Sequence, residues 1–435
     1  MIVVLSGVAL GAAALVIAGP LSPPGGPVAS SYKTLNDVEP RIAINSANTP
    51  GGASAAVHLI NQPGSYYLSG NITAAAGKSA ILITANNVTI DLNGFTINGV
   101  TGTTQALIQI TGDAANAGDP RGNVAIKSGT VRGGGGDGIN ASTNAASRVR
   151  LDNVIACNNA GDGFDLASWC TFQDCTSISN GGIGFRATDN VVGHGCTARA
   201  NNQDEWSIGN SGSLTNCIAD NASGSGYGFK IGSGNTLTGC TAIGSALDSG
   251  VRAVAAGNTF SACVSNSNGG SGFSSDNGSN TALGCTATGN GAHGFSLGVG
   301  SQVSGSSSCN NGQHGILAVS GSMVSSNSCF ANGTDGIRVS GPGTVKDNNC
   351  SNNSGAGILA TGSSGARIEG NTVAANGTGI SVSGGAFVAR NTARANGASG
   401  VNDFVSTGTN AVGQIFDVTA GATITTSNSF ANFKY

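Results

Sequence analysis

Glycine recurs along most of this chain at a nearly constant interval, and no other feature of the sequence constrains the fold as strongly. After a first step of 25 residues, successive glycines lie 21 to 23 residues apart if Glu205 is given one place. Asn-Gly often precedes them, as at Asn290-Gly291. Both residue types tolerate a positive φ, so each repeat contains a tight turn that leads into a strand. The glycine column comprises Gly138, Gly163, Gly184, Gly228, Gly250, Gly272, Gly294, Gly315, Gly336, Gly357, Gly379 and Gly400.

A bulky apolar residue follows each position of the glycine column, and a second recurring position carries cysteine. The apolar residues run from Ile139 and Phe164 to Ile380 and Val401. The cysteine column comprises Cys175, Cys196, Cys217, Cys240, Cys263, Cys285, Cys309, Cys329 and Cys350. Val373 continues it, which indicates a buried position. A third alternating segment, such as Thr236-Leu237-Thr238, lies between the two columns. Each repeat is therefore predicted to hold three short strands and no helix.

A repeat of about 22 residues cannot bury its apolar face alone, but stacked repeats join those faces into one core. Stacking at the inter-strand spacing places like residues on like residues, which gives an interior apolar ladder and a cysteine ladder. The sequence thus predicts an all-β solenoid, a parallel β-helix of about a dozen coils. We expect caps at both ends, because an open strand edge invites pairing with other chains.

The first coils carry a family resemblance. Residues 60–68, 80–83 and 88–97 resemble the entry coils of pectate-lyase-like and other carbohydrate-associated right-handed β-helix proteins, and the Asn-Gly-x-x-Gly-Ile/Phe repeats are similar to theirs. The resemblance covers roughly residues 55–435. It implies a right-handed coil and an association with polysaccharide. It does not imply one reaction, because this fold hosts lyases, hydrolases, epimerases, binding proteins and structural fibres.

The N-terminus predicts export. Residues 1–18 form a short apolar stretch, and small, turn-forming residues follow it, as in a secretory signal peptide cleaved after Ala18 or Ala29. A buried first strand is the alternative. We expect a signal peptide at 1–29, a linker and cap at 30–54, the β-helix at 55–409 and a final coil and cap at 410–435. The mature chain would then be secreted or held at the cell surface, without a membrane span.

Charge is scarce in this sequence. Charged residues make up 9% of the chain, against about 25% in an average soluble domain. The net charge is −3 and no basic run occurs, so nucleic acid is not an expected partner. The eleven cysteines would suggest disulfides in an exported protein. Stacked cysteines, however, place their Cβ atoms about 4.8 Å apart, whereas a disulfide needs about 3.8 Å. We expect mostly free, buried thiols, with Cys157 and Cys170 as the exceptions.

The few charged side chains are unevenly placed. Residues 253–334 hold one, Asp276, whereas residues 137–252 hold many. Several of these align with the glycine column: Asp137, Asp162 and Glu205 at or just before it, and Asp165, Arg186, Lys230 and Arg252 just after the apolar residue. By alternation the second set points outward on one sheet. We call these seven residues the charged strip. The alternative interpretation is that the charged strip only keeps the chain soluble.

The resemblance implies roles for the charged strip. Asp162, Asp165, Arg186 and Glu205 are the catalytic candidates, and Asp137, Lys230, Arg252 and Trp169 are the candidates for substrate binding. Carboxylates could hold Ca²⁺ against an acidic sugar, while arginine or lysine abstracts its α-proton, as in a lyase. No other cofactor is expected. Trp169 and Tyr227 are the aromatic side chains available to stack on sugar, whereas Trp206 falls in the core column.

Two smaller sequence patterns are candidates for a catalytic site and a metal site. Asp162, within Asn159-Ala-Gly-Asp-Gly-Phe, resembles the Asn-x-Asp-Gly segment of polygalacturonase-type hydrolases, and Gly-His194-Gly resembles their Gly-His-Gly. His194, however, precedes Cys196 and so belongs to another face, and only Asp162 stays a candidate. His293, His314 and Asp335 share one column in successive coils, as metal ligands or as a solvated turn ladder. We favour the turn ladder and expect no metal.

Three functions remain open at this level. The first is binding of extracellular polysaccharide with weak or no catalysis. The second is a polysaccharide lyase or glycoside hydrolase, and the third is a structural rod of a surface or matrix. A catalytic groove usually needs long loops, and the constant repeat leaves no room for them after residue 163. The longer connections, near 98–123 and 132–150, adjoin the charged strip. The first function is therefore favoured.

Overall fold

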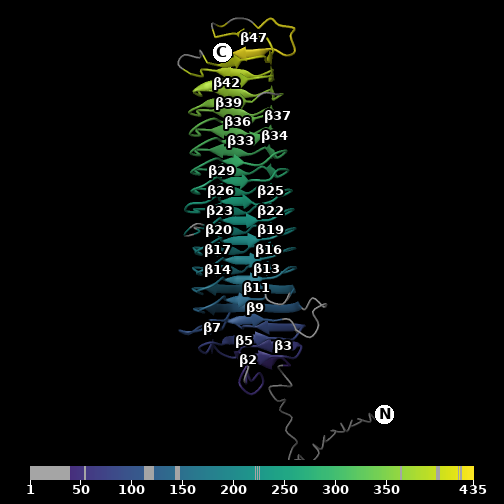
Figure 1. The fold of residues 1–435 in the computed structure, drawn as a ribbon, viewed down its shortest axis with the longest axis vertical. Helices are drawn as coiled ribbons and strands as arrows, with labels where there is room; N and C mark the ends of the chain where they lie inside the picture. Colours follow the sequence, from purple (N-terminus) through teal and green to yellow (C-terminus); the bar gives the residue numbers. More distant parts are fainter. Residues whose placement is uncertain are drawn as a thin grey trace, which may run out of the picture. The chain divides into compact units, whose positions relative to one another are not determined.

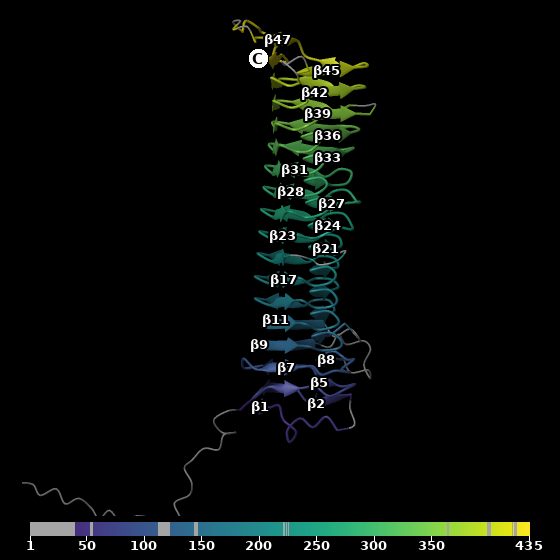
Figure 2. The same ribbon diagram turned by 90° about the vertical axis from the view of Figure 1, so that its left-hand side faces the viewer.

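The computed structural model describes residues 40–52, 55–111, 122–142, 147–220, 222, 224, 226–362, 365–397, 402–419, 421 and 424–435. The chain divides into two units, Met1–Arg41 and Ile42–Tyr435, and the predicted signal peptide lies outside the described residues. The second unit is a parallel β-helix whose coils lie one above another, and no helix occurs in its described ranges (Figures 1 and 2). We therefore find no helix there with the length and apolarity that a membrane crossing requires.

Each coil contributes one strand to each of three parallel ladders. The first ladder has sixteen strands. They are β2 (Ala56–Ile60), β5 (Ser79–Ile83), β8 (Ile108–Ile110), β10 (Ile139–Asn140), β12 (Phe164–Leu166), β15 (Phe185–Ala187), β18 (Trp206–Ile208), β21 (Phe229–Ile231), β24 (Val251–Ala253), β27 (Phe273–Ser275), β30 (Phe295–Ser296), β33 (Ile316–Val319), β36 (Ile337–Ser340), β39 (Ala356–Thr361), β42 (Thr378–Ser383) and β45 (Phe404–Thr407).

The second ladder follows the first in every coil. Its strands are β1 (Ile42–Ala43), β3 (Gly64–Tyr67), β6 (Val88–Asp91), β9 (Gly122–Arg132), β11 (Ser147–Cys157), β13 (Thr171–Gln173), β16 (Val192–His194), β19 (Ser213–Thr215), β22 (Thr236–Thr238), β25 (Thr259–Ser261), β28 (Thr281–Leu283), β31 (Gln302–Ser304), β34 (Ser322–Ser325), β37 (Gly343–Lys346), β40 (Arg367–Glu369), β43 (Phe387–Ala389) and β46 (Ala411–Val412).

The third ladder closes the coil, and the long strands β9 and β11 run through both the second and the third. Its other strands are β4 (Ile72–Thr73), β7 (Thr96–Asn98), β14 (Thr176–Ile178), β17 (Thr197–Arg199), β20 (Ile218–Asp220), β23 (Thr241–Ile243), β26 (Val264–Asn266), β29 (Thr286–Thr288), β32 (Ser307–Cys309), β35 (Ser328–Phe330), β38 (Asn349–Ser351), β41 (Thr372–Ala374), β44 (Thr392–Arg394), β47 (Ile415–Asp417) and β48 (Asn432–Lys434).

The core lies inside the coils and is built from the apolar residues that follow the glycine column. Phe185 and Trp206 are fully buried and stack with ring centroids 4.0 Å apart, and Phe273 stacks on Phe295 at 4.9 Å. Alternation along each strand points the next side chain outward. The predicted all-β solenoid with three short strands per coil is confirmed.

Asparagine side chains line the corners between the ladders. In the corner before the first ladder, the Asn332 side chain accepts hydrogen bonds from the backbone and side-chain amides of Asn311, at 3.2 and 3.0 Å. Its own side-chain amide donates to Asn353 of the next coil at 2.9 Å. Buried amides satisfied in this way join coil to coil without leaving polar groups unpaired.

The predicted number of coils and the predicted register of the last coil are wrong. The first ladder has sixteen strands rather than about a dozen, because the entry coils carry no glycine column. In the last coil, Ile380 pairs with Phe404 rather than with Val401. Gly400 and Val401 lie outside the described residues.

The predicted cysteine column is three separate columns. Cys175 to Cys285 occupy the corner between the second and third ladders, and beyond Cys285 that corner continues through Ser306 to Asn327. Cys309 instead pairs with Phe330 in the third ladder, where Cys329 pairs with Cys350. All eleven cysteines, including Cys157 and Cys170, are free thiols.

Candidate functional site

The outward positions of the first ladder form one row along successive coils. Asp165 pairs with Arg186, which pairs with Ser207, and Lys230 and Arg252 follow in the next two coils. Because the apolar residue before each of them is buried in the core, these side chains face outward. The alignment expected from the glycine column is therefore present in the structure.

A second row of carboxylates lies in the turn just before the first ladder. The Oδ1 atoms of Asp137, Asp162 and Asp204 each accept the backbone N–H of the equivalent residue one coil further, at 2.7, 2.6 and 2.9 Å. One oxygen of each carboxylate is thus used to hold two coils together. The other oxygen, Oδ2, is left for the outward row.

Three cations of the outward row, Arg186, Lys230 and Arg252, each meet a carboxylate. Arg186 Nε lies 2.9 Å from Asp162 Oδ2, and Lys230 Nζ lies 3.7 Å from Asp204 Oδ2. Arg252 forms an ion pair with Asp276. These pairs hold the three cations in defined positions while their side chains stay partly exposed. The row therefore presents alternating donors and acceptors rather than a band of uncompensated positive charge.

The lower end of the row is a hydrogen-bonded polar cluster. The Asn140 amide donates to Asp137 Oδ2 at 2.7 Å and to Asp165 Oδ2 at 3.1 Å. Ser142 donates to the same Asp165 oxygen at 2.8 Å, and Gln109 donates to Asn140 Oδ1 at 3.1 Å. Ser142 lies within the longer connection near 132–150, so this connection contacts the charged strip at Asp165.

Partial burial changes the protonation of these carboxyl groups. Burial raises the pKa of Asp162 to about 6, despite the hydrogen bond from Ile183 and the nearby Arg186. It also raises the pKa of Asp165 and Asp204. A raised carboxyl pKa is common where an enzyme needs a general acid. Here one Asp162 oxygen accepts the Ile183 N–H and the other pairs with Arg186, so the carboxylate is held in a fixed orientation.

The structure contradicts the placement of Glu205 on the charged strip. Its side chain points inward and is fully buried, and it accepts both amides of Asn201. Burial raises its pKa to about 8. The glycine column faces the interior corner, so a side chain at this position enters the asparagine ladder and cannot reach a ligand on the outer face.

Trp169 lies away from the strip. It occupies the turn after β12, with a positive φ of 62°, and its ring is well exposed. Its backbone N–H donates to the Asp189 carbonyl at 2.9 Å. Among the described residues, no hydrogen bond or ring contact joins the Trp169 side chain to the strip. His194 lies on β16 of the second ladder, the separate face that the sequence indicated.

The two histidines and Asp335 form part of the turn row. The His293 and His314 rings stack at 5.1 Å, and His314 Nδ1 lies 3.2 Å from Asp335 Oδ2. The backbone N–H of His314 donates to His293 Nδ1 at 3.3 Å. In other coils an aspartate oxygen accepts the equivalent N–H. Burial and the neighbouring His314 lower the pKa of His293 to about 4. Within the described ranges, no cluster of His, Cys, Asp or Glu is arranged to hold a metal ion.

Sequence reasoning missed three residues of this surface. Asp204 stands directly before Glu205, so the glycine column itself places it beside Asp137 and Asp162, and this signal was available. Asp276 is the single charged residue in a long neutral stretch, which also marks it. Asn140 follows the apolar Ile139, in the same outward position as Asp165.

Comparison with known proteins agrees with this architecture. A family profile described as "Right handed beta helix region" matches residues 167–311 and 297–434. These residues make up more than half of the sequence, so the chain belongs to the family of right-handed β-helix proteins. No curated protein matches the sequence.

Several solved structures are similar to this chain at low identity. The A-module of the Azotobacter vinelandii mannuronan C-5 epimerase AlgE6 is 16% identical, with 80% of this chain and 91% of that chain covered and a TM-score of 0.46. Pectate lyase Pel9A is 14% identical, with 76% and 72% covered and a TM-score of 0.31. The Dettilon tailspike protein is 14% identical, with 85% and 62% covered and a TM-score of 0.35.

Proposed function

We propose that this protein binds an extracellular polysaccharide along the outward row of the first ladder and does not cleave it. The observation that carries the proposal is the set of cation–carboxylate pairs that recur along that row, from Arg186 with Asp162 to Arg252 with Asp276. The predicted signal peptide at 1–29 is part of the same proposal, since it would bring the chain to such a ligand.

The chemistry of a sugar chain suits this row. Each sugar carries neighbouring hydroxyl groups that both donate and accept hydrogen bonds. A fixed pair such as Arg186 and Asp162 offers donors and acceptors on adjacent atoms, and a hydrogen bond to a charged group is worth about 1.5–3 kcal/mol. Successive coils lie about 4.8 Å apart, so Arg186 and Lys230 are separated by two coils and Lys230 and Arg252 by one. An extended chain lying along the row can therefore meet several pairs in succession.

The site chemistry favours binding over cleavage. A cleaving enzyme normally encloses its substrate in a groove built by long loops, and the near-constant repeat leaves no room for such loops after residue 163. Asp162 has one contact to the protein on each oxygen, so its carboxylate is fixed as an acceptor beside Arg186. Glu205, the other acidic candidate with a strongly raised pKa, is buried in the corner.

The proposal is tested with a panel of acidic and neutral polysaccharides, measured for binding and for released products. The double variant Arg186→Ala/Lys230→Ala should weaken binding about a hundredfold, since two charged contacts are lost. The matched control is Lys127→Ala/Arg199→Ala, which removes two paired cations from the other two ladders. Equal binding by the first variant and the wild type would leave the strip as a solubility feature. Unsaturated products or new reducing ends would instead identify an enzyme.

A further inference from the structure

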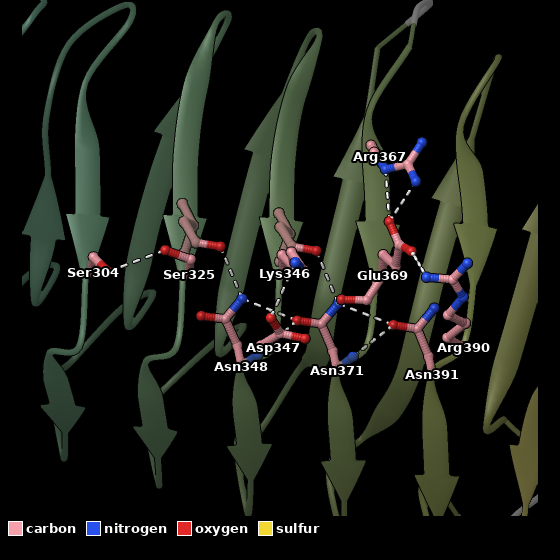
Figure 3. Close-up of polar contacts among 12 residues, drawn as sticks. Ser304, Ser325, Lys346, Asp347, Asn348, Arg367, Glu369, Asn371, Arg390 and Asn391 are labelled. Atoms are coloured by element: carbon pink, nitrogen blue, oxygen red, sulfur yellow. Dashed lines mark hydrogen bonds and ion pairs between the residues drawn. The ribbon is translucent and has the colours of Figure 1, made fainter.

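A second polar and aromatic cluster lies near the C-terminal end of the second ladder. Arg367 of β40, Phe387 of β43 and Ala411 of β46 follow one another in a single outward column. Figure 3 shows Arg367 and Arg390 both directed at Glu369, which shares β40 with Arg367. This cluster belongs to a different ladder from the charged strip.

Glu369 fixes both arginines. Its side chain is 7% exposed and lies 2.6 Å from Arg367 Nη2 and 2.7 Å from Arg390 Nη1. Arg390 Nε also donates to the Ser429 carbonyl at 2.9 Å. A guanidinium carries five N–H donors, so both arginines keep donors that these contacts do not use. The two cationic groups are thus rigidly placed, and about half of each side chain remains exposed to solvent.

Each guanidinium in turn holds an aromatic ring. Arg367 Cζ lies 4.8 Å from the centre of the Phe387 ring, and Arg390 Cζ lies 5.4 Å from that of Phe430. The two rings meet edge to face, with centroids 6.0 Å apart and planes at 84°. Cation–π and edge-to-face contacts of this kind restrict ring orientation. The rings are therefore set in place before any ligand arrives.

The two rings form walls of a shallow cavity of about 310 Å³. Gln414, Asn428 and residues 411–413 complete its lining. Asn428 Oδ1 accepts the Phe430 N–H at 2.9 Å, which leaves its amide nitrogen as a donor. The cavity thus combines flat apolar walls with amide groups, the lining that a single sugar ring requires.

We propose that this cavity binds one residue of an acidic sugar, such as a uronate at the end of a glycan chain. The apolar face of the ring would lie on Phe387 or Phe430, and its hydroxyls would meet Gln414 and Asn428. The negative group would be favoured by the local charge. Arg367 and Arg390 lie against the two ring walls, and together they carry one more charge than the Glu369 carboxylate that pairs with both.

This site does not depend on the charged strip, and the experiment separates the two. Binding of tri-galacturonic acid and of neutral galactotriose is measured by calorimetry on the full chain, in the wild type and in the Arg186→Ala/Lys230→Ala background. Phe430→Leu keeps apolar volume but removes the aromatic face. It should weaken binding of the acidic probe about tenfold in both backgrounds, in the range of an aromatic contact. The matched control Phe330→Leu, an exposed aromatic on the third ladder, should bind as its parent does.

The outcomes are distinct. Weaker binding of tri-galacturonic acid by Phe430→Leu, together with weak binding of the neutral probe, supports the site. No binding of the acidic probe by the strip-deficient background, or equal binding by Phe430→Leu and its parent, overturns it. Equal affinity for both probes overturns the preference for an acidic sugar. Gln414→Ala provides a second variant that alters the lining without removing an aromatic side chain.

Discussion

The Glu205 carboxylate accepts hydrogen bonds from the backbone N–H of Asn201, at 3.1 Å, and from the Asn201 side-chain amide. In the coils before it, asparagine of the next coil makes the equivalent contacts, as Asn201 does for Asn180. The coil after Asn201 has Ala222 at that position, so no asparagine is available there. Glu205 enters the corner from the glycine column and satisfies the amides of Asn201, where the first stretch of the ladder ends. Asp403 does the same for Asn396 near the C-terminus.

The first prediction concerns the pH dependence of stability. Burial raises the pKa of Glu205 to about 8 in the folded chain, well above its unfolded value of about 4.3. Between these values the folded state binds more protons than the unfolded state, so stability falls as pH rises from about 5 to 8. Glu205→Gln should remove much of this dependence and raise the free energy of unfolding at pH 8 by roughly 2 kcal/mol. Its oxygen can accept both Asn201 amides.

Urea unfolding at pH 5 and pH 8 provides the measurement for this substitution. Asp347→Asn, an exposed position directly after β37, is the control and should leave the pH profile nearly unchanged. If Glu205→Gln were less stable than the wild type at both pH values, the carboxylate would be stabilising in its charged form and the argument from burial would be wrong.

The second prediction concerns one rung of the asparagine ladder. Asn332 accepts two amides of Asn311 and donates to Asn353 and to the Ser308 carbonyl. Asn332→Ala leaves these buried groups without a partner, at a cost of about 3 kcal/mol. The exposed Asn349 of β38 offers a control, and Asn349→Ala should shift the urea midpoint little. Similar midpoints for the two variants would contradict a stabilising role for the ladder.

The third prediction concerns the thiols. Ellman titration of the denatured, unreduced protein should count more than half of the eleven cysteines as free, because the structure holds all of them as thiols. In the folded protein, the half-buried Cys157 and Cys309 should react first, since the other nine are buried. Burial also raises the pKa of Cys170 to about 12, which suppresses its reactive thiolate. A titration that finds one free thiol or none would disprove the geometric argument against disulfides.

The fourth prediction concerns the pH dependence of glycan binding. Because the pKa of Asp162 is about 6, its carboxylate is charged above pH 6 and becomes protonated below it. Protonation removes the ion pair with Arg186 and one acceptor for sugar hydroxyls. Binding should therefore weaken as pH falls from 7 to 5, and Asp162→Asn should flatten this profile. A profile that stays unchanged in Asp162→Asn would assign the titration to another group.

Local spacing was sufficient to predict the coil, because each turn repeats the same backbone requirement. Gly138 to Gly379 mark a strand start in every coil, and the outward direction of Arg186 follows from Phe185 being buried. Spacing was not sufficient for the cysteines. Cys285 lies nine residues before its glycine, whereas Cys309 lies six before Gly315. This difference in spacing places Cys309 in another column. Grouping the residues by type, as cysteines, did not reveal the difference.

The sequence predicted the site only where the alternation of side chains along a strand determines which face a residue occupies. This alternation placed Asp165, Lys230 and Arg252 in one row. It could not show that Glu205 would turn inward, because that depends on the missing asparagine at Ala222 in a neighbouring coil. The pairing of Lys230 with Asp204 and the contacts of Arg367 with Phe387 depend on side-chain rotamers across coils, which a one-dimensional pattern does not specify.

Because successive corners have the same structure, whole coils can be removed or added, which changes the length of the molecule. Asn290 and Asn311 occupy equivalent places, each bonded to the asparagine one coil further. Excision of residues 291–311 would join Asn290 directly to Gly312 and restore the same Asn-Gly turn, so that Asn290 would meet Asn332. Coils interact only with their neighbours in such an array. Whole coils can therefore be gained or lost in evolution, and a ligand surface can be lengthened without redesign of the core.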